Sequence, residues 1–536
     1  MKRLMVGLVM AACLFAPCAR GAGQSCEQLA QLALPHTKIT SAQEAAAGTF
    51  TPPPALTPWL NGDTSMFKQA PAFCRVTAEA KPTADSDIKI EVWLPATGWN
   101  GKFRGQGNGG FAGEIDYRAL ALAVMQGYAT AATDTGHAAA GIDASWAPGH
   151  PEKIVDFGYR AIHEMTQTGK AVTQAFYGDE PKRSYFANCS NGGRQGLMEA
   201  QRFPQDYDGI LVGAPANYWT HLVSSSLWDA QATTQDPASY IPAGKIPTIA
   251  KAVVAACDGQ DGVKDGLLND PRKCGFQPET LLCKGADSDS CLTQPQLTAL
   301  KKLYQGAHDT RGRAIFPGFV TGGEEGEGGW ALWITGPAPG KGLLFAFDYG
   351  FFSGMVYGKP DWDYHTANLD EAVAAADQKF ATVLNATDTD MKAFAARGGK
   401  LIVYHGWSDP GISPLYSIDY YESVVKKMGR QGADAFLRLY MVPGMQHCGG
   451  GPGPDLFGEF GIATANDPQH SMYVALEEWV EKGTPPGAVI AAKMDGMGPG
   501  AKVKMTRPLC AYPQIAKYKG SGDTNDAANF TCQNPK

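Results

Sequence analysis

Two hydrophobic periods alternate along most of the chain. Short apolar or alternating runs typical of strands occur at residues 88–95, 128–133, 183–187, 209–213, 401–404 and 436–442. Patterns typical of helices lie between or after them, at residues 117–126, 154–177, 194–202, 416–427 and 472–482. Strands that alternate with helices at this spacing predict an α/β fold, in which helices cover both faces of a mostly parallel sheet.

This alternation breaks down between residues 217 and 387. The stretch holds four closely spaced cysteines, an acidic loop, a run rich in Gly and Glu at 322–329, and many aromatic residues at 330–362. A chain of 536 residues is also too long for one minimal domain. We therefore predict a lid domain at 217–387, inserted into a catalytic domain formed by residues 22–216 and 388–536.

The first 21 residues predict an export signal. Lys2 and Arg3 precede an apolar run that ends at Ala16, and small residues around Ala19 offer a cleavage site. The run is too short for a permanent membrane anchor, although a lipid-modified Cys13 is an alternative. We expect a soluble mature protein that is secreted or periplasmic. The net charge of −7 argues against nucleic acid or an anionic membrane as partner.

Twelve cysteines are present, and two of them, Cys13 and Cys18, belong to the predicted signal. The remaining even number in an exported chain favours disulfides over metal thiolates. Nearness in sequence and the need to tie down both ends predict the pairs Cys257–Cys274, Cys283–Cys291, Cys510–Cys532 and Cys26–Cys74. Cys189 and Cys448 are then left over, far apart in the sequence.

Residues 188–193, Asn-Cys-Ser-Asn-Gly-Gly, lie between a strand-like run and a helix-like run. A serine at such a turn is the layout of a nucleophile elbow, where small neighbours let the hydroxyl project. The usual pattern is Gly-x-Ser-x-Gly, and Asn188 replaces the first glycine with a residue type that tolerates unusual backbone angles. Taken alone, the match fits a nucleophile at Ser190 and an ordinary serine in a glycine-rich turn equally well.

Two later loops supply partners for this serine. A serine hydroxyl needs a general base, and the base needs an acid; in sheet-based hydrolases they follow in the order Ser, acid, His at strand ends. Asp409 follows one predicted core strand and His447 follows the next. Each is plausible singly as a loop residue, but together they predict a triad.

A disulfide needs α-carbons within about 7 Å, so a Cys189–Cys448 bond would clamp the Ser and His loops together. The alternative is that each cysteine pairs elsewhere or stays reduced.

An oxyanion hole requires the amide of the residue after the nucleophile, here Asn191, and a second amide from an earlier loop. The run Gly107-Asn108-Gly109-Gly110 is the candidate, because glycine lets a backbone approach the substrate closely. We predict Gly110, ahead of Gly109, as the second donor. An ordinary flexible loop is the alternative.

An acidic loop within the insertion suggests a cation site. Asp258, Asp261 and Asp265 lie between Cys257 and Cys274, with glycines that permit a tight wrap. Such a loop suits a hard cation such as Ca²⁺, although its spacing is not that of an EF-hand and a plain acidic surface turn explains the composition equally well. Calcium so far from the serine would be structural.

These residues together resemble the tannase/feruloyl esterase family of α/β-hydrolases, which includes the hydrolase of mono(2-hydroxyethyl) terephthalate. The resemblance extends over nearly the whole mature chain, and its most specific marks are Cys189-Ser190, Asp409 and His447-Cys448. It implies that Ser190 is the nucleophile, His447 the base and Asp409 the orienting acid, with a Cys189–Cys448 disulfide beneath them.

The resemblance also implies a structural Ca²⁺ site in the lid. Its ligands would be the side chains of Asp258, Asp261 and Asp265 and the carbonyl groups of Val263 and Leu267.

The family cleaves esters of aromatic acids, which implies a small aromatic ester as substrate. The terephthalate enzyme, as the resemblance implies, uses a lid arginine for the free carboxylate, but this chain has no Arg between Arg313 and Arg397. Lys341 or Lys359 lacks the bidentate fork of arginine. We therefore predict a secreted serine carboxylesterase for hydroxycinnamoyl (feruloyl) esters. A galloyl ester (tannase) or terephthalate monoester hydrolase is the alternative, and a catalytically silent aromatic- or carbohydrate-binding protein or a peptidase are the rivals.

Overall fold

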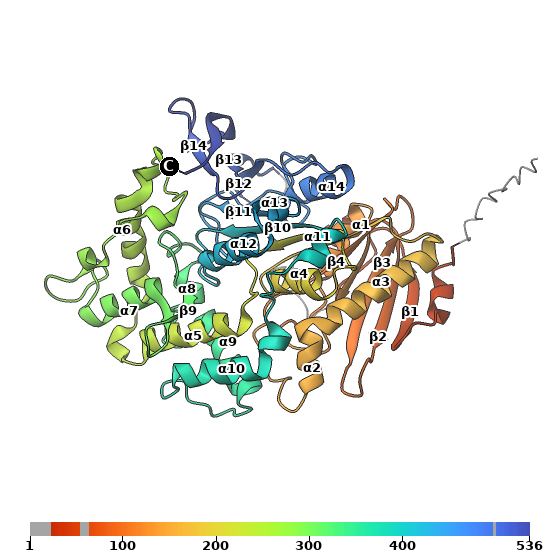
Figure 1. Cartoon of the computed structure of the whole chain (residues 1–536), viewed down its shortest axis with the longest axis horizontal. Helices are drawn as coiled ribbons and strands as arrows, with labels where there is room; N and C mark the ends of the chain where they lie inside the picture. Colours follow the sequence, from red (N-terminus) through yellow and green to blue (C-terminus); the bar gives the residue numbers. More distant parts are fainter. Residues whose placement is uncertain (1–22, 54–63, 497–499, 536) are drawn as a thin grey trace, which may run out of the picture.

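A nine-stranded sheet forms the centre of the molecule (Figure 1). The computed structural model describes residues 23–53, 64–496 and 500–535, so the predicted export signal lies outside the described residues. In spatial order the strands are β1 (Thr37–Ala45), β2 (Phe73–Ala80), β3 (Ile88–Pro95), β5 (Ala129–Thr133), β4 (Lys102–Gln106), β6 (Arg183–Cys189), β7 (Gly209–Gly213), β10 (Lys400–Gly406) and β11 (Leu437–Val442).

Pairing is antiparallel at one end of this sheet and parallel over the rest. β1, β2, β3 and β5 pair antiparallel, whereas all neighbours from β5 to β11 are parallel. Parallel neighbours bring the carboxyl ends of β6, β10 and β11 to one edge, so the loops that follow these strands converge.

Both faces of the parallel part are buried. In β7, Ile210 and Val212 belong to one hydrophobic cluster and Leu211 to another, because successive side chains of a strand point to opposite faces. The first cluster includes side chains of α3 (Ala161–Tyr177), α4 (Asn191–Arg202), α11 (Lys392–Ala396) and α12 (Pro414–Met428). The second includes side chains of α1 (Tyr117–Met125) and α14 (Met472–Lys482). The predicted α/β fold with helices on both faces is confirmed.

Residues 214–399 add no strand to the large sheet. They form α5 (Trp219–Thr234), α6 (Ile246–Cys257), α7 (Gln294–Gln305), α8 (Trp330–Trp333), α9 (Leu343–Tyr349), a π-helical turn (Gly350–Val356), α10 (Leu369–Leu384) and the small β8 (Gly306–His308) and β9 (Ala314–Pro317) pair. Figure 1 shows α5, α6, α7, α8 and α9 grouped on its left side, whereas β1 lies on the right. The lid boundaries 217 and 387 stay a prediction.

Several elements differ from the sequence-based prediction. The helix expected at 154–177 is interrupted, because α2 (Pro151–Val155) joins α3 through a π-helical turn at Asp156–Arg160. α4 begins at Asn191 and not at residue 194. The first three residues, Asn and two Gly, are weak helix formers, so the sequence pattern did not indicate that the helix begins directly after Ser190. Strands β1 and β2 were not predicted, and neither were the C-terminal β12 (Val489–Met494), β13 (Val503–Leu509), β14 (Ile515–Tyr518) and β15 (Phe530–Gln533).

Within the described ranges, no helix is long and apolar enough to cross a membrane.

Candidate active site

Ser190 occupies a strained turn between β6 and α4. Its φ of 64° and ψ of −125° fall where residues other than glycine are rare, and its amide donates to the Gly213 carbonyl over 2.9 Å. A Cβ on Gly192 would lie 2.0 Å from Asn188 Oδ1, and one on Gly193 would lie 2.6 Å from the Gly213 oxygen. The two glycines therefore make room for the turn, as a nucleophile elbow requires.

Asp409 and His447 meet at the same edge of the sheet. Asp409 follows β10 and His447 follows β11. His447 Nδ1 donates to Asp409 Oδ2 over 2.8 Å, while the amides of Gly411 and Ile412 donate to Asp409 Oδ1 over 2.8 and 2.9 Å. With Nδ1 committed to the carboxylate, His447 keeps Nε2 available as a base.

His405 is a second imidazole on the same carboxylate, and sequence reasoning missed it. The last residues of β10 include this side chain, which is fully buried, and its Nε2 lies 3.1 Å from Asp409 Oδ2. The other ring nitrogen, Nδ1, lies 2.7 Å from Ser417 Oγ. The signal available in the sequence was its spacing of four residues before Asp409, which is not specific.

The electrostatics of Asp409 favour its charged form. Burial alone would raise the pKa of this carboxyl group, but the two histidines outweigh burial and hold its pKa well below the usual range. An ionised Asp409 orients the His447 ring and stabilises the imidazolium that forms when His447 takes a proton.

A disulfide holds the serine loop against the histidine loop. Cys189 directly precedes Ser190, Cys448 directly follows His447, and the two cysteines are bonded with a Cα–Cα separation of 5.9 Å. Residues 259 positions apart in sequence are thereby fixed side by side. The structure also contains the other four expected bonds, Cys26–Cys74, Cys257–Cys274, Cys283–Cys291 and Cys510–Cys532.

The two predicted oxyanion donors lie on segments that are tied together. Asn191 is the first residue of α4, and its side chain donates to the Asn108 carbonyl over 3.3 Å. Gln195 adds a second tie, because its Oε1 accepts from the Asn108 amide and its Nε2 donates to Asn108 Oδ1. Gly110 has a φ of 54°, and a Cβ there would lie 2.1 Å from the Gly141 oxygen. Glycine is therefore required at 110.

A buried guanidinium, also missed in the sequence, supports this loop. Arg194 donates to Asn191 Oδ1 over 2.8 Å and to the carbonyls of Phe157 and Gly158 at the π-helical turn. Burial lowers its pKa to about 9, and its side chain bonds no carboxylate among the described residues. Arg194 thus joins α4 to the interrupted helix by hydrogen bonds to neutral groups.

Aromatic side chains of the insertion cover the site. The Trp333 ring contacts the His447 ring edge-on, with centroids 4.7 Å apart. Phe347, on α9, lies within 3.2 Å of the position that a Cβ on Gly110 would take. The lid therefore contacts both the histidine loop and the loop predicted to hold the oxyanion.

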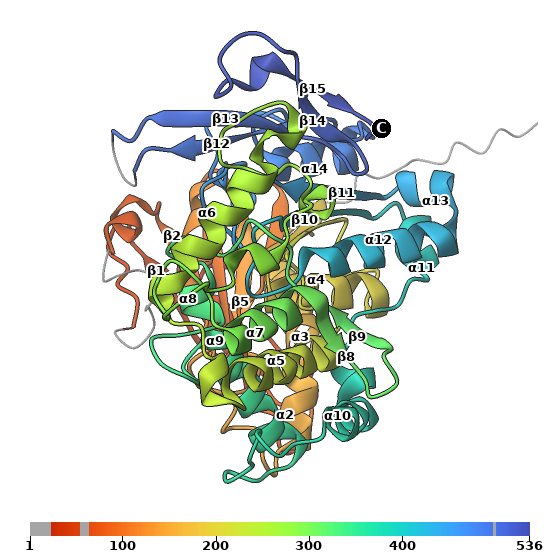
Figure 2. The same ribbon diagram turned by 90° about the vertical axis from the view of Figure 1, so that its left-hand side faces the viewer.

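The predicted calcium loop packs against the C-terminal strands. Val263 shares a small hydrophobic cluster with Cys510, Ala516 and Phe530, and the Arg507 guanidinium of β13 forms an ion pair with Asp265. Figures 1 and 2 both place α6, which precedes the loop, beside these strands.

The carboxylates of this loop are directed inward by their own backbone. Asp258 Oδ1 accepts from the amides of Asp265 and Gly266, while the amides of Val263 and Leu267 donate to the carboxylates of Asp261 and Asp265. Burial raises the pKa of Asp261 to about 6, and the charges of Asp265 and Asp258 add to the effect. A bound divalent cation would relieve this repulsion among oxygen donors, and the Arg507 guanidinium, paired with Asp265, already offsets part of it.

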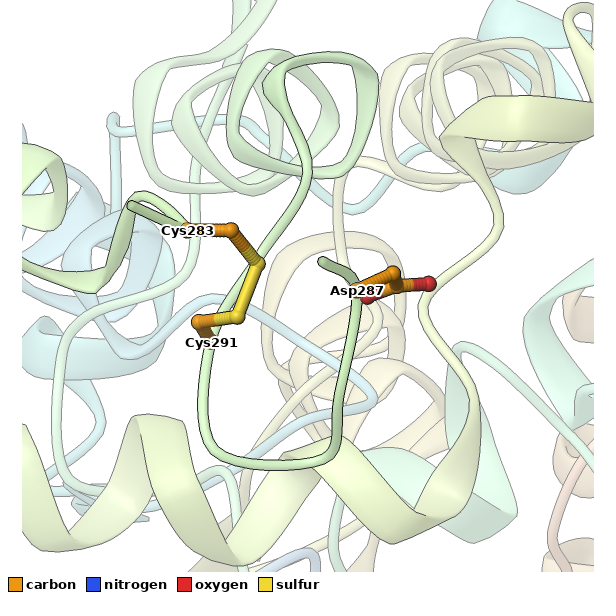
Figure 3. A group of neighbouring side chains, drawn as sticks. All are labelled: Cys283, Asp287 and Cys291. Atoms are coloured by element: carbon orange, nitrogen blue, oxygen red, sulfur yellow. A yellow bond between two sulfur atoms is a disulfide. The ribbon is translucent and has the colours of Figure 1, made fainter. Parts of the chain in front are cut away.

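Among the described residues, two groups of three possible metal ligands have ligand atoms within 4.8 Å of one another, and the predicted calcium loop is not one of them. The first, Cys283, Asp287 and Cys291, contains a disulfide (Figure 3), so its sulfurs are not thiolate ligands. The second consists of His163, Glu199 and Asp206 and could hold a metal ion. It lies on α3, α4 and the loop after α4, in a different part of the chain from the predicted calcium loop.

The fold and these convergent loops define the class of protein as an α/β-hydrolase. The family model described as "Tannase and feruloyl esterase" matches residues 74–533. An uncharacterized esterase of Xanthomonas campestris is 44% identical over 95% of this chain and 91% of its own length. Feruloyl esterase B of Aspergillus niger is 33% identical over 86% of each chain. The crystal structure of feruloyl esterase B from Aspergillus oryzae superimposes with a TM-score of 0.85 at 29% identity, covering 95% of this chain and 99% of that one.

The chain therefore belongs to the tannase and feruloyl esterase family, and it is a carboxylic ester hydrolase of that family. The predicted family resemblance is confirmed.

Proposed function

We propose that Ser190, Asp409 and His447 form the catalytic triad of this esterase. The observation that carries the proposal is the 2.8 Å hydrogen bond from His447 Nδ1 to the buried Asp409. The Cys189–Cys448 disulfide joins the loop of His447 to that of Ser190. The three residues come from the carboxyl ends of three strands of one sheet, in the order that this fold uses.

In the acylation step, Nε2 of His447 acts as the general base. Ser190 Oγ attacks the carbonyl carbon of the ester while His447 Nε2 takes the hydroxyl proton. The amides of Asn191 and Gly110 donate to the oxyanion that develops on the carbonyl oxygen. When the tetrahedral intermediate collapses, the bond to the alcohol breaks and His447 gives its proton to the leaving oxygen.

Deacylation repeats these steps with water. His447 removes a proton from a water molecule, which attacks the acyl-enzyme carbonyl, and the acid is released as Ser190 regains its proton. Asp409 stays ionised throughout, because the hydrogen bonds that it accepts stabilise its charge.

The acyl group that we propose is a hydroxycinnamate of the feruloyl type. The support comes from relatives named feruloyl esterase B, from aromatic side chains beside the site, and from a lid without Arg between Arg313 and Arg397. A galloyl ester or a terephthalate monoester is the competing outcome of the test below.

A structural Ca²⁺ would be held by the loop between Cys257 and Cys274. We propose the side chains of Asp258, Asp261 and Asp265 and the carbonyls of Val263 and Leu267 as ligands; the ion would stiffen the contact between the lid and the C-terminal strands. Five disulfides also support export to an oxidising compartment, secreted or periplasmic.

Hydrolysis of methyl ferulate, methyl gallate and mono(2-hydroxyethyl) terephthalate should be measured side by side, with Ser190→Ala as the control. We expect clear preference for the ferulate ester and no turnover by the variant. A preference for one of the other two esters would replace the acyl group proposed. Turnover retained by a folded Ser190→Ala protein would overturn the triad.

A further inference from the structure

A cluster of three possible metal ligands lies apart from the proposed triad. His163 is on α3, Glu199 is on α4 and Asp206 is in the loop between α4 and β7, and one ligand atom of each lies within 4.8 Å of the other two. An α-helix rises about 1.5 Å per residue, so Glu199 lies about 12 Å along α4 from Asn191. The proposed ester chemistry uses none of the three side chains in this cluster.

Glu199 is a buried acid without a hydrogen-bond donor. It is only 1% exposed, and neither of its carboxyl oxygens has a hydrogen-bond partner among the described residues. Burial raises the pKa of Glu199 well above its usual range, and the charge of Asp206 raises it further. A buried carboxylate without partners is destabilising, so these oxygens require either a proton or a cation.

The other two side chains are held in place by neighbouring groups. His163 Nδ1 lies 2.6 Å from Asp206 Oδ2, and the His163 ring stacks on Phe203 with ring centroids 3.9 Å apart. Gln167 Nε2 donates to Asp206 Oδ1 over 2.8 Å. Contacts of this kind orient metal ligands, because they fix the ring and the carboxylate before an ion binds.

The charges around the cluster favour a cation. Glu199 and Asp206 supply two negative charges when both are ionised, whereas Lys170 of α3, which donates to the Asp206 carbonyl, supplies one positive charge. Arg397, which also interacts with Lys170, is paired with Asp208 over 3.0 Å. The net charge of the ionised group is therefore negative, which attracts a cation and repels an anion.

The donor atoms distinguish Zn²⁺ from Ca²⁺. Ca²⁺ takes about six to eight oxygen ligands, whereas Zn²⁺ takes about four and accepts an imidazole nitrogen together with carboxylate oxygens. The cluster offers three such ligands, and a water molecule can supply the fourth from the side of His163, whose side chain is 29% exposed. A mixed nitrogen and oxygen set of this size suits Zn²⁺.

We propose that His163, Glu199 and Asp206 bind one Zn²⁺ ion, which joins α4 to α3. The ion takes the place of the proton on Glu199, which is released to solvent, and the ligating nitrogen of His163 leaves its proton to the other ring nitrogen. Because α4 begins directly after Ser190, the ion stiffens the helix that follows the nucleophile turn without contacting the ester. Its role is structural, and the proposal does not depend on the proposed function.

Binding is tested with Co²⁺, which replaces Zn²⁺ and absorbs visible light strongly when it has four ligands. The whole chain is freed of metal with a chelator and then kept in excess Ca²⁺, so that the predicted lid site is occupied. We expect one equivalent of Co²⁺ to bind and one equivalent of Zn²⁺ to displace it. Absence of saturable Co²⁺ binding overturns the proposal and leaves a proton shared between Glu199 and Asp206 in its place.

Two variants each remove one ligand. Glu199→Gln keeps the volume of the side chain and removes its charge, whereas His163→Gln changes a partly exposed side chain and so keeps the test open if the buried variant does not fold. Loss of a group that merely supports a ligand weakens metal binding by about 10- to 100-fold, so each variant should weaken Co²⁺ binding at least tenfold. Unchanged affinity in both folded variants overturns the assignment.

His470→Gln is the matched control. His470 Nδ1 also pairs with a carboxylate, that of Asp467 over 2.9 Å, and its side chain is 30% exposed. This pair precedes α14 and does not belong to the cluster, so Co²⁺ affinity should be unchanged. Equal weakening in His163→Gln and His470→Gln would show that the cluster is not the binding site.

Thermal unfolding in excess Ca²⁺ gives a second measurement. Added Zn²⁺ should raise the Tm of the native chain and of Ser190→Ala equally, because an ion that binds the folded state alone stabilises it and this ion does not contact the triad. The Tm of Glu199→Gln should not respond. The same Zn²⁺ response in Glu199→Gln and in the native chain contradicts the proposal.

Discussion

The buried carboxyl group of Asp409 differs from those of Asp229 (α5) and Asp348 (α9) in the direction of its pKa shift, although all three are hidden from water. Asp409 accepts hydrogen bonds from two backbone amides and two imidazoles, and its pKa is held low. Asp348 of α9 has no partner for either carboxyl oxygen among the described residues, and burial raises the pKa of both Asp348 and Asp229 of α5. The comparison teaches that partners, and not burial, decide whether a hidden acid is charged.

The two regions are also held in place differently. The loops of the proposed triad follow the parallel strands β6, β10 and β11 of one sheet, and a disulfide between distant parts of the chain joins the first loop to the last. The lid carries two disulfides that close short loops of its own, with sequence separations of 17 and 8. The sheet therefore fixes the loops of the proposed triad, and the insertion is held by local links that leave this sheet unchanged.

Asp409→Asn should produce the largest effect. An amide cannot hold His447 in the tautomer that leaves Nε2 free, so we expect kcat to fall by about 10⁴-fold while the protein stays folded. Ester hydrolysis and circular dichroism measure the two properties. Loss of less than tenfold would mean that His447 is oriented by another group.

Loss of the central disulfide should come next. Replacing Cys189 and Cys448 together by serine removes a link across 259 residues, which predicts destabilisation by about 2–5 kcal/mol in urea unfolding. The control replaces Cys283 and Cys291, whose bond spans only 8 residues and should matter less. Equal losses in the two double variants would contradict the assigned role of the central bond.

His405→Phe tests the second imidazole on Asp409. Losing a hydrogen bond to a charged group costs about 1.5–3 kcal/mol, so the free energy of unfolding should fall by about that amount. Asp409 would then hold the His447 proton more tightly, and the acidic limb of the pH–rate profile should move to higher pH. His405→Gln retains a donor and should restore the limb in part; an unmoved limb would indicate a merely structural residue.

Removal of Ca²⁺ should lower the thermal stability of the protein more than its rate of ester hydrolysis. Chelation is expected to reduce Tm, with added Ca²⁺ restoring it in the native chain but not in Asp261→Asn. Because the pKa of Asp261 is raised to about 6, protons compete with the cation, and Ca²⁺ affinity should weaken as pH falls through about 6. Calorimetric titration at several pH values measures this, and pH-independent affinity would exclude Asp261 as a ligand.

The smallest effect concerns the lid acids. A carboxyl group whose pKa is raised on folding keeps a proton that the unfolded chain releases, so stability falls as pH rises above about 4, the unfolded value, toward the folded pKa. Asp348→Asn removes this penalty, and its Tm relative to the native chain should increase with pH over that window. Asp409 acts in the opposite sense, since its stabilising contribution is lost only as pH falls below 4. A constant Tm difference between the Asp348→Asn and native chains would contradict the assigned pKa shift.

Much of the core could be predicted from the sequence. Apolar and polar residues alternate at 88–95, as expected for a strand, and β3 has these bounds. The helix predicted at residues 472–482 likewise has the bounds of α14. β1 and β2 were missed because their polar and small residues carry a weak pattern; β2 acquires strand structure by pairing with β3, and β1 by pairing with β2. The start of α4 was hidden by glycines that the elbow requires.

The sequence by itself determined the order of Ser190, Asp409 and His447 and their places after three core strands, since parallel strands deliver their following loops to one edge. It could not determine which side chains meet across that edge. His405 lies only four positions before Asp409, and Arg194 three positions after Asn191, but no sequence pattern marks either contact. Arg194 also donates to the carbonyls of Gly158 and Phe157, 36 and 37 positions away. Burial and hydrogen bonding set the charge of these groups, and both are properties of the packed tertiary structure.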